Sequence, residues 1–141
     1  MSLDKLENLV KIGHLKREPA DKQEFTGMLE SARARLQDAK LTGLSDNSKF
    51  TLAYGAAHAL SLAALRWHGY RSESRYLVFQ CLEQTLGVDA AKWRVLDKCH
   101  QRRNLAEYEG HLEIDKQLLK ELIGITEELL ELVNALGKIE S

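Results

Sequence analysis

Apolar residues recur along this chain at intervals of three and four positions, which is the spacing of one helix face. No stretch alternates convincingly with a period of two, so the pattern predicts helices and no strand. Between about Ser48 and His68, apolar residues occupy nearly every side of the predicted helix. A helix that is apolar all round is buried all round, so we expect this one at the centre of a bundle. Its alanines and Gly55 favour close approach of neighbouring helices, and we interpret His58 as a core histidine with satisfied hydrogen bonds rather than a ligand.

Capping residues and glycines separate the other helices. Ser2 caps a short first helix, and Pro19 prevents its continuation. Asp21 caps a second helix, and a polar loop over 41–48 follows it. Later caps and glycines predict three more helices, over about 72–86, 89–109 and 115–136.

The last predicted helix carries leucine and isoleucine at alternating spacings of four and three, a heptad pattern. Additional apolar positions widen this pattern, which favours packing within a bundle over a seam reserved for a coiled-coil partner. Short loops between long helices then predict an all-α fold, an antiparallel up-and-down bundle of five or six helices. The whole chain, 1–141, is expected to form a single domain.

The fifth predicted helix, 89–110, breaks its own apolar pattern near its end. On a helical wheel Arg103 lies inside the apolar stripe, close to Cys99. Arginine cannot lose its charge, and burying it unpaired costs on the order of 3–5 kcal/mol. The position is therefore either a structural ion pair, for example with Glu107 four residues later, or part of a functional site. Its polar neighbours at helical spacing or nearby are His100, Asn104, Glu107 and Tyr108.

Composition places the chain among globular proteins, with 44% hydrophobic and 29% charged residues. Residues 1–12 lack an apolar run of signal-peptide type, and the longest uncharged stretch, 50–65, is 16 residues, too short to span a membrane. We therefore expect a cytoplasmic protein with no membrane association. Cys81 and Cys99 lack metal-ligand spacing and are interpreted as two buried thiols; neither a metal nor a cofactor is expected.

Charge is unevenly distributed along the chain. Residues 66–103 contain eight Lys or Arg and four acidic residues, a net charge of +4, whereas residues 104–141 contain three and nine, a net charge of −6. A basic surface beside the polar cluster would suit an anionic ligand such as RNA or a nucleotide. The alternative is a set of solvated helix faces. The basic residues of the first segment are Arg66, Arg71, Arg75, Lys92, Arg94, Lys98, Arg102 and Arg103.

Three segments together resemble one bacterial subfamily of the HEPN superfamily, the higher eukaryote and prokaryote nucleotide-binding domains. They are FTLAYGAAHALSLAALRWHGYR (50–71), RYLVFQCLEQTLG (75–87) and RRNLAEYEG (102–110), the last containing Arg103 and Asn104. The resemblance implies a compact helical bundle that forms a homodimer. It also implies a metal-independent endoribonuclease, often the toxin of a toxin–antitoxin pair with a nucleotidyltransferase-like antitoxin, or a domain that binds only nucleotides or partner proteins.

The usual catalytic signature of the family is an arginine followed by four to six residues and a histidine. Five residues after Arg103 this chain has Tyr108, whose ordinary pKa of about 10 makes it a poor base. His100 and His111 lie near Arg103 in the sequence but outside the signature. The resemblance thus implies Arg103, Tyr108 and His100 as candidate catalytic residues. Arg102, Arg103, Asn104 and Tyr108 are the candidates for binding RNA or a nucleotide.

Three interpretations remain open. The first is an RNA-cleaving enzyme with an atypical site, and the second is a domain of the same fold that binds RNA or a nucleotide without catalysis. The third is a structural or partner-binding bundle in which Arg103 forms a buried ion pair. A likeness of fold does not by itself assign an activity.

Overall fold

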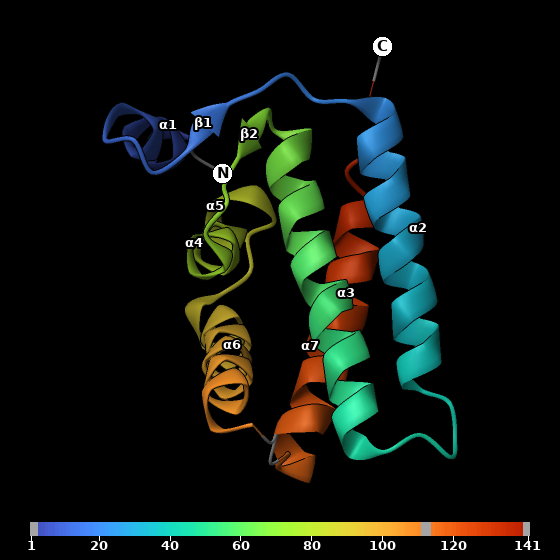
Figure 1. Ribbon diagram of the computed structural model, residues 1–141. Coiled ribbons are helices and arrows are strands. Elements are labelled where there is room, and N and C mark those ends of the chain that lie inside the picture. The colour runs from blue at the N-terminus through green and yellow to red at the C-terminus, as the bar shows by residue number, and fades with distance from the viewer. Residues whose placement is uncertain (1–2, 111–113, 140–141) are drawn as a thin grey trace.

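The computed structural model describes residues 3–110 and 114–139. Three long helices, α2 (Lys22–Ala39), α3 (Asp46–Trp67) and α7 (Lys116–Asn134), lie side by side and form the body of the molecule (Figure 1). Shorter elements pack around one end of α3: α1 (Asp4–Lys11), α4 (Arg75–Gln80) and α5 (Leu82–Thr85). The all-α class predicted from the sequence is confirmed.

Helix α3 is the central element, as its apolar surface predicts. It contacts α2, α4, α5, α6 (Ala90–Glu109) and α7. Its small residues form contact surfaces on several sides, and Leu60 is fully buried at its middle. The buried alanines of α3 are Ala53, Ala56, Ala57, Ala63 and Ala64.

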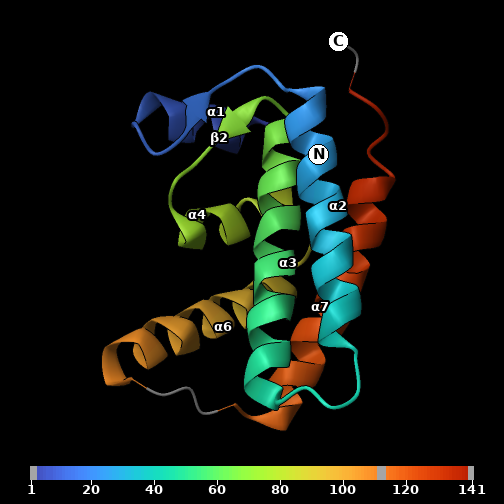
Figure 2. The same cartoon turned by 45° about the vertical axis from the view of Figure 1, so that its right-hand side comes forward.

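The direction of α7 follows from the path of the chain between α3 and α7. Helix α2 runs antiparallel to α3, but α7 runs in the same direction as α3 (Figures 1 and 2). The Nε1 of Trp67 at the end of α3 donates to the carbonyl of Gly137 just beyond α7, at 3.3 Å. Helices α4, α5 and α6 carry the chain back along the bundle before α7 begins, so α7 is a parallel neighbour of α3. No helix among residues 3–110 and 114–139 is long and apolar enough to cross a bilayer.

Capping side chains mark the starts of α2, α3, α4, α6 and α7, whereas α1 and α5 have no side-chain cap; Ser2, the predicted cap of the first helix, lies outside the described residues. Asp21 and Asp89 each accept a hydrogen bond from a backbone N–H three residues later, as predicted. The predicted fourth helix is two short pieces instead, because the chain turns at Cys81; Ser74 caps the first piece. Gly110 ends α6 with φ +83°, a conformation that favours glycine.

A small antiparallel sheet corrects the prediction that the chain has no strand. Strand β1 (Lys16–Arg17) pairs with β2 (Tyr70–Arg71), with Lys16 opposite Arg71. Each strand has two residues, too few to produce a period-two pattern in the sequence. The pairing joins α1 to the end of α3.

Helix α6 is anchored at its first half and extends away from the bundle at its second half. Its fully buried residues are Leu96 and Cys99, and Lys92 binds Glu128 of α7 at 2.7 Å. Figure 2 shows α6 crossing the bundle at a steep angle. Arg103 lies just after the buried part, where α6 still passes α3.

Candidate anion-binding cleft

A cleft of about 340 Å³ lies where α2, α3, α4 and α6 meet. Helix α3 supplies its wall, and three other helices each contribute one arginine. We call it the arginine cleft; its lining residues are Arg35, Thr51, Leu52, Tyr54, Gly55, His58, Arg75 and Arg103.

The three arginines of the cleft carry positive charge that the described residues leave largely unbalanced. No Asp or Glu lines the cleft in the described part of the chain. Arg35 and Arg75 form no ion pair with any described residue. Arg103 has Glu107 at 3.7 Å, and their side chains are 33% and 66% exposed. Such an exposed pair stabilises a fold by about 0.3–0.5 kcal/mol, so it is not the buried pair of the structural interpretation.

Gly55 brings Arg35 into the cleft. A Cβ at this position would lie 3.0 Å from Nη1 of Arg35, closer than ordinary van der Waals contact. The guanidinium of Arg35 therefore rests against the backbone of α3. The sequence indicated that Gly55 permits close approach at this helix, and the group that approaches is a charged side chain.

Tyr54 forms the base on which two of the arginines rest. Its ring is buried, and the guanidinium carbons of Arg103 and Arg75 lie 5.3 and 5.8 Å from the ring centroid, within cation–π range. Phe79 packs edge-on against the same ring. Burial raises the pKa of the Tyr54 hydroxyl, so the group stays protonated at neutral pH.

A chain of hydrogen bonds runs from α6 to the Tyr54 hydroxyl. The Nδ2 of Asn104 lies 3.1 Å from Nε2 of His100, and Nδ1 of His100 lies 2.9 Å from the Tyr54 oxygen. The amide nitrogen donates to Nε2, so in the neutral ring Nδ1 carries the hydrogen and donates to Tyr54. The hydroxyl hydrogen of Tyr54 is then free to donate to another group. Burial lowers the pKa of His100, which favours this neutral ring.

His58 is a further neutral group in the cleft. Burial, followed by the positive charges of Arg75 and Arg103, lowers the pKa of His58 from 6.5 to about 4. The ring packs edge-on against Phe79 at 6.0 Å. His58 thus lines a pocket, contrary to the interpretation of a satisfied core histidine.

The candidates from the sequence are divided by the fold. Arg103 lines the cleft, and His100 and Asn104 reach it through Tyr54. Arg102 is exposed and does not line the cleft. Tyr108 is 91% exposed near the end of α6 and does not line it either, so its role stays a prediction. His111 lies outside the described residues.

Sequence reasoning missed Arg35, Arg75 and the contacts that Tyr54 makes with two of the arginines. Arg75 had been identified only as one member of the basic segment 66–103. Arg35 lies in the second helix with no unusual pattern around it. The one local signal was Gly55 within an otherwise alanine-rich helix.

A second group of arginines has a purely structural arrangement. Arg66 is 2% exposed and donates to the carboxylate of Glu24 and to the carbonyl oxygens of Glu18 and Pro19. Arg71 donates to Glu18 and Glu24, both at 2.6 Å. These bonds hold the segment before α2 against the end of α3. The contrast with the arginine cleft is direct, because here every guanidinium has carboxylate partners.

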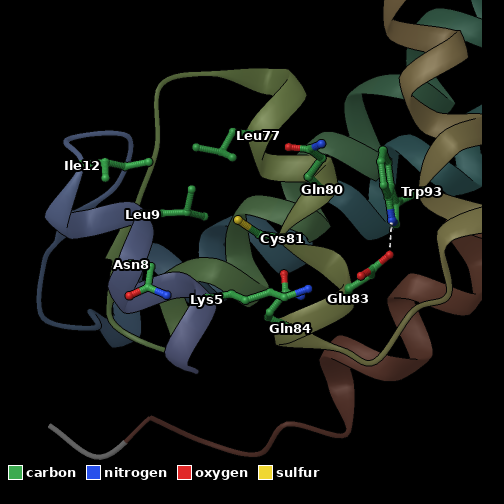
Figure 3. Close-up of a pocket in the computed structure, with 10 residues that line it drawn as sticks. All are labelled: Lys5, Asn8, Leu9, Ile12, Leu77, Gln80, Cys81, Glu83, Gln84 and Trp93. Carbon is green, nitrogen blue, oxygen red and sulfur yellow. Dashed lines mark hydrogen bonds between the residues drawn. The ribbon is translucent and has the colours of Figure 1, made fainter. Parts of the chain in front are cut away.

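A second pocket of about 350 Å³ lies between α1, α4, α5 and the start of α6 (Figure 3). Apolar groups of Leu9, Leu77 and Cys81 form its centre, and Trp93 lies at one end with its indole nitrogen donating to Glu83 at 2.7 Å. Burial raises the pKa of the Cys81 thiol to about 12, so that thiol is unreactive at neutral pH. Cys81 and Cys99 are both buried, as predicted, and both are free.

Comparison with known proteins gives no match to a family model, a curated protein or a solved structure.

Proposed function

We propose that this protein binds single-stranded RNA and holds a phosphate group of the RNA in the arginine cleft. The observation that carries the proposal is the convergence of Arg35, Arg75 and Arg103 on one cleft without an acidic residue in its described lining. Three like charges at one site repel each other, and a bound anion removes that repulsion. The planar guanidinium also presents paired N–H donors that match phosphate oxygens.

The Tyr54 hydroxyl adds a fourth donor to the cleft. In the tautomer of His100 that accepts from Asn104, Nδ1 donates to the tyrosine oxygen at 2.9 Å, and the hydroxyl hydrogen could then turn toward a phosphate oxygen. The neutral state of His58 avoids a fourth positive charge. RNA is proposed among the anionic ligands on the resemblance of 50–71, 75–87 and 102–110 to the HEPN superfamily.

Fluorescence anisotropy with a labelled single-stranded RNA tests the proposal. Arg35→Gln and Arg75→Gln should each weaken binding by about tenfold or more, the scale of one charge-assisted hydrogen-bond pair. Arg33→Gln is the matched control, since Arg33 lies on the same helix and donates to Asn134 outside the cleft. Equal losses for Arg33→Gln and Arg35→Gln would indicate general charge attraction and reject the site.

A metal-independent endoribonuclease is the second candidate, and the position of His58 favours it. The neutral imidazole of His58 has a lone pair that could take the proton of a ribose 2′-hydroxyl, but its pKa of about 4 makes it a weak base unless a bound phosphate raises that pKa. The 2′-oxygen would then bond to phosphorus as the bond to the 5′-oxygen breaks, with water protonating the leaving oxygen. The products would be a 2′,3′-cyclic phosphate end and a 5′-hydroxyl end.

Cleavage in the presence of a chelator would support the second candidate. His58→Gln should abolish it while RNA binding persists, whereas Tyr108→His would restore the family signature and should raise the rate if Tyr108 lies at the reacting centre. If the RNA stays intact with wild-type protein, cleavage is rejected and only the RNA-binding proposal remains.

The resemblance also supports a homodimer and a nucleotidyltransferase-like antitoxin as partners, and both remain proposals. In the dimer we expect Arg103 of each protomer to face a common cleft. Light scattering at micromolar concentration that returns only the monomer mass would reject the dimer.

A further inference from the structure

We propose that the arginine cleft selects a terminal phosphate of the RNA, a phosphomonoester, over the internal phosphodiesters of the chain. The inference rests on the proposed function and specifies which phosphate the site takes. It follows from the charge of the cleft, from the four helices that supply its donors and from the wall that α3 forms behind them.

The charge of the cleft matches a dianion better than a monoanion. Arg35, Arg75 and Arg103 contribute three positive charges, and no acidic residue lines the cleft in the described part of the chain. An internal phosphodiester carries one negative charge, whereas a terminal phosphate carries about 1.5 to 2 at neutral pH. Arg103 is also the only one of the three with a described carboxylate nearby, at 3.7 Å on its exposed side. A monoanion would leave at least one guanidinium without a counter-charge.

The donor groups belong to four different helices. Arg35 belongs to α2, Arg75 to α4 and Arg103 to α6, and the Tyr54 hydroxyl belongs to α3. A terminal phosphate has three free oxygens, each able to accept more than one hydrogen bond. A phosphodiester has two free oxygens, and its two ester oxygens continue into the chain. Donors arriving from four helices therefore match the terminal group.

The cleft is backed by α3. Tyr54 is 2% exposed, and its ring supports Arg75 and Arg103 from below. Arg35 occupies the space beside Gly55, and its Nη1 lies 3.0 Å from the point where a Cβ on Gly55 would stand. The backbone of α3 thus closes the cleft behind the arginines. A terminal phosphate could enter against this back with its single chain leaving toward solvent.

The test compares RNAs of one sequence, about eight nucleotides long, within the usual site size for single strands. They carry a 5′-phosphate, a 3′-phosphate or hydroxyl groups at both ends, and an internal label reports binding by anisotropy at constant ionic strength. The two phosphorylated arms identify which end is bound. At least one should bind about tenfold more tightly than the hydroxyl form. Arg35→Gln should remove this difference, whereas Arg33→Gln should keep it.

The outcomes separate the inference from the proposed function. Equal binding of all three RNAs, with Arg35→Gln weakening each alike, would overturn the terminal-phosphate inference and leave RNA binding in place. Absence of binding to any RNA would reject both. Circular dichroism of Arg35→Gln confirms that the variant is folded, as expected for an exposed side chain without an ion pair among the described residues.

Discussion

Nη1 of Arg35 lies 3.0 Å from the point where a Cβ on Gly55 would stand, so the absence of a side chain at Gly55 determines where the Arg35 guanidinium rests. One residue of the central helix thereby positions a charge that belongs to a different helix. The neighbouring Tyr54 supports the other two arginines. The cleft is thus built on two consecutive residues of α3.

Gly55→Ala should separate stability from binding. Alanine is favoured over glycine in a helix interior by about 0.8–1.0 kcal/mol, and the atom it meets is the flexible end of Arg35. We therefore expect a fold at least as stable as wild type, but RNA affinity about tenfold weaker because Arg35 is displaced. Gly27→Ala is the control, since nothing lies within 4 Å of its Cβ. If both variants bind RNA as wild type does, Arg35 is not part of the site.

Tyr54→Phe tests the hydrogen-bond chain from Asn104 through His100. It removes the hydroxyl but keeps the ring beneath the arginines, so it leaves the buried packing intact. We expect a stability loss of about 1–2 kcal/mol, from the bond to His100, together with weaker RNA binding. Asn104→Leu should weaken binding in the same direction without touching the ligand, since it acts through His100. Unchanged affinity in both variants would show that the hydroxyl does not contact RNA.

Arg66→Met and Arg103→Gln should differ in their effect on stability. Arg66 is buried and paired, and its removal leaves the Glu24 carboxylate with fewer partners, at a cost of about 3–5 kcal/mol. Arg103→Gln loses a long, half-exposed pair and a cation–π contact with Tyr54, so we expect a change of about 1 kcal/mol. Urea unfolding measures both. If Arg103→Gln is destabilised as much as Arg66→Met, the role of Arg103 is structural.

Some of this site was predictable from local sequence pattern. Arg103 can be recognised because its angle on the helix conflicts with the apolar residues around it, and the burial of Tyr54 is expected because its helix is apolar on all sides. Asp21 and Asp89 were identified as caps because a cap depends on neighbours within three residues. Such features can be recognised from the sequence of a single helix.

The rest required tertiary structure. Arg35 and Arg75 lie 40 positions apart in the sequence and reach the cleft from different helices, which no periodicity can show. The parallel direction of α7 relative to α3 depends on the path of α4, α5 and α6. Loop lengths in the sequence do not reveal that path. The two-residue strands β1 and β2 are held by Arg66 and Arg71 through Glu18 and Glu24, contacts between distant segments.

Acid should destabilise the fold through His58. Its pKa of about 4 lies below the unfolded value near 6.5, so the neutral ring is favoured in the fold. This contribution is complete above about pH 6.5 and is lost as the pH falls toward 4, by on the order of 3 kcal/mol. Burial is the main cause of this low pKa, and the basic groups of Arg75, Arg103, His100 and Arg35 lower it further.

Urea unfolding of wild type and His58→Gln between pH 7 and pH 4 measures this contribution. The wild type should lose more stability over that range than the variant. If the stabilities of wild type and His58→Gln change with pH in parallel, the lowered pKa of His58 is contradicted. A bound phosphate should also raise the pKa of His58 by offsetting the arginines, which NMR titration of the ring with and without RNA detects.

The central claim is that three arginines jointly hold one phosphate, and NMR of the arginine Nε–Hε groups tests it most directly. During titration with single-stranded RNA, the signals of Arg35, Arg75 and Arg103 should shift together and saturate at one ligand concentration. The signals of Arg66 and Arg71, already bound to Glu18 and Glu24, should stay in place. Shifts spread over surface arginines such as Arg33 and Arg94, with those three unchanged, would contradict the account.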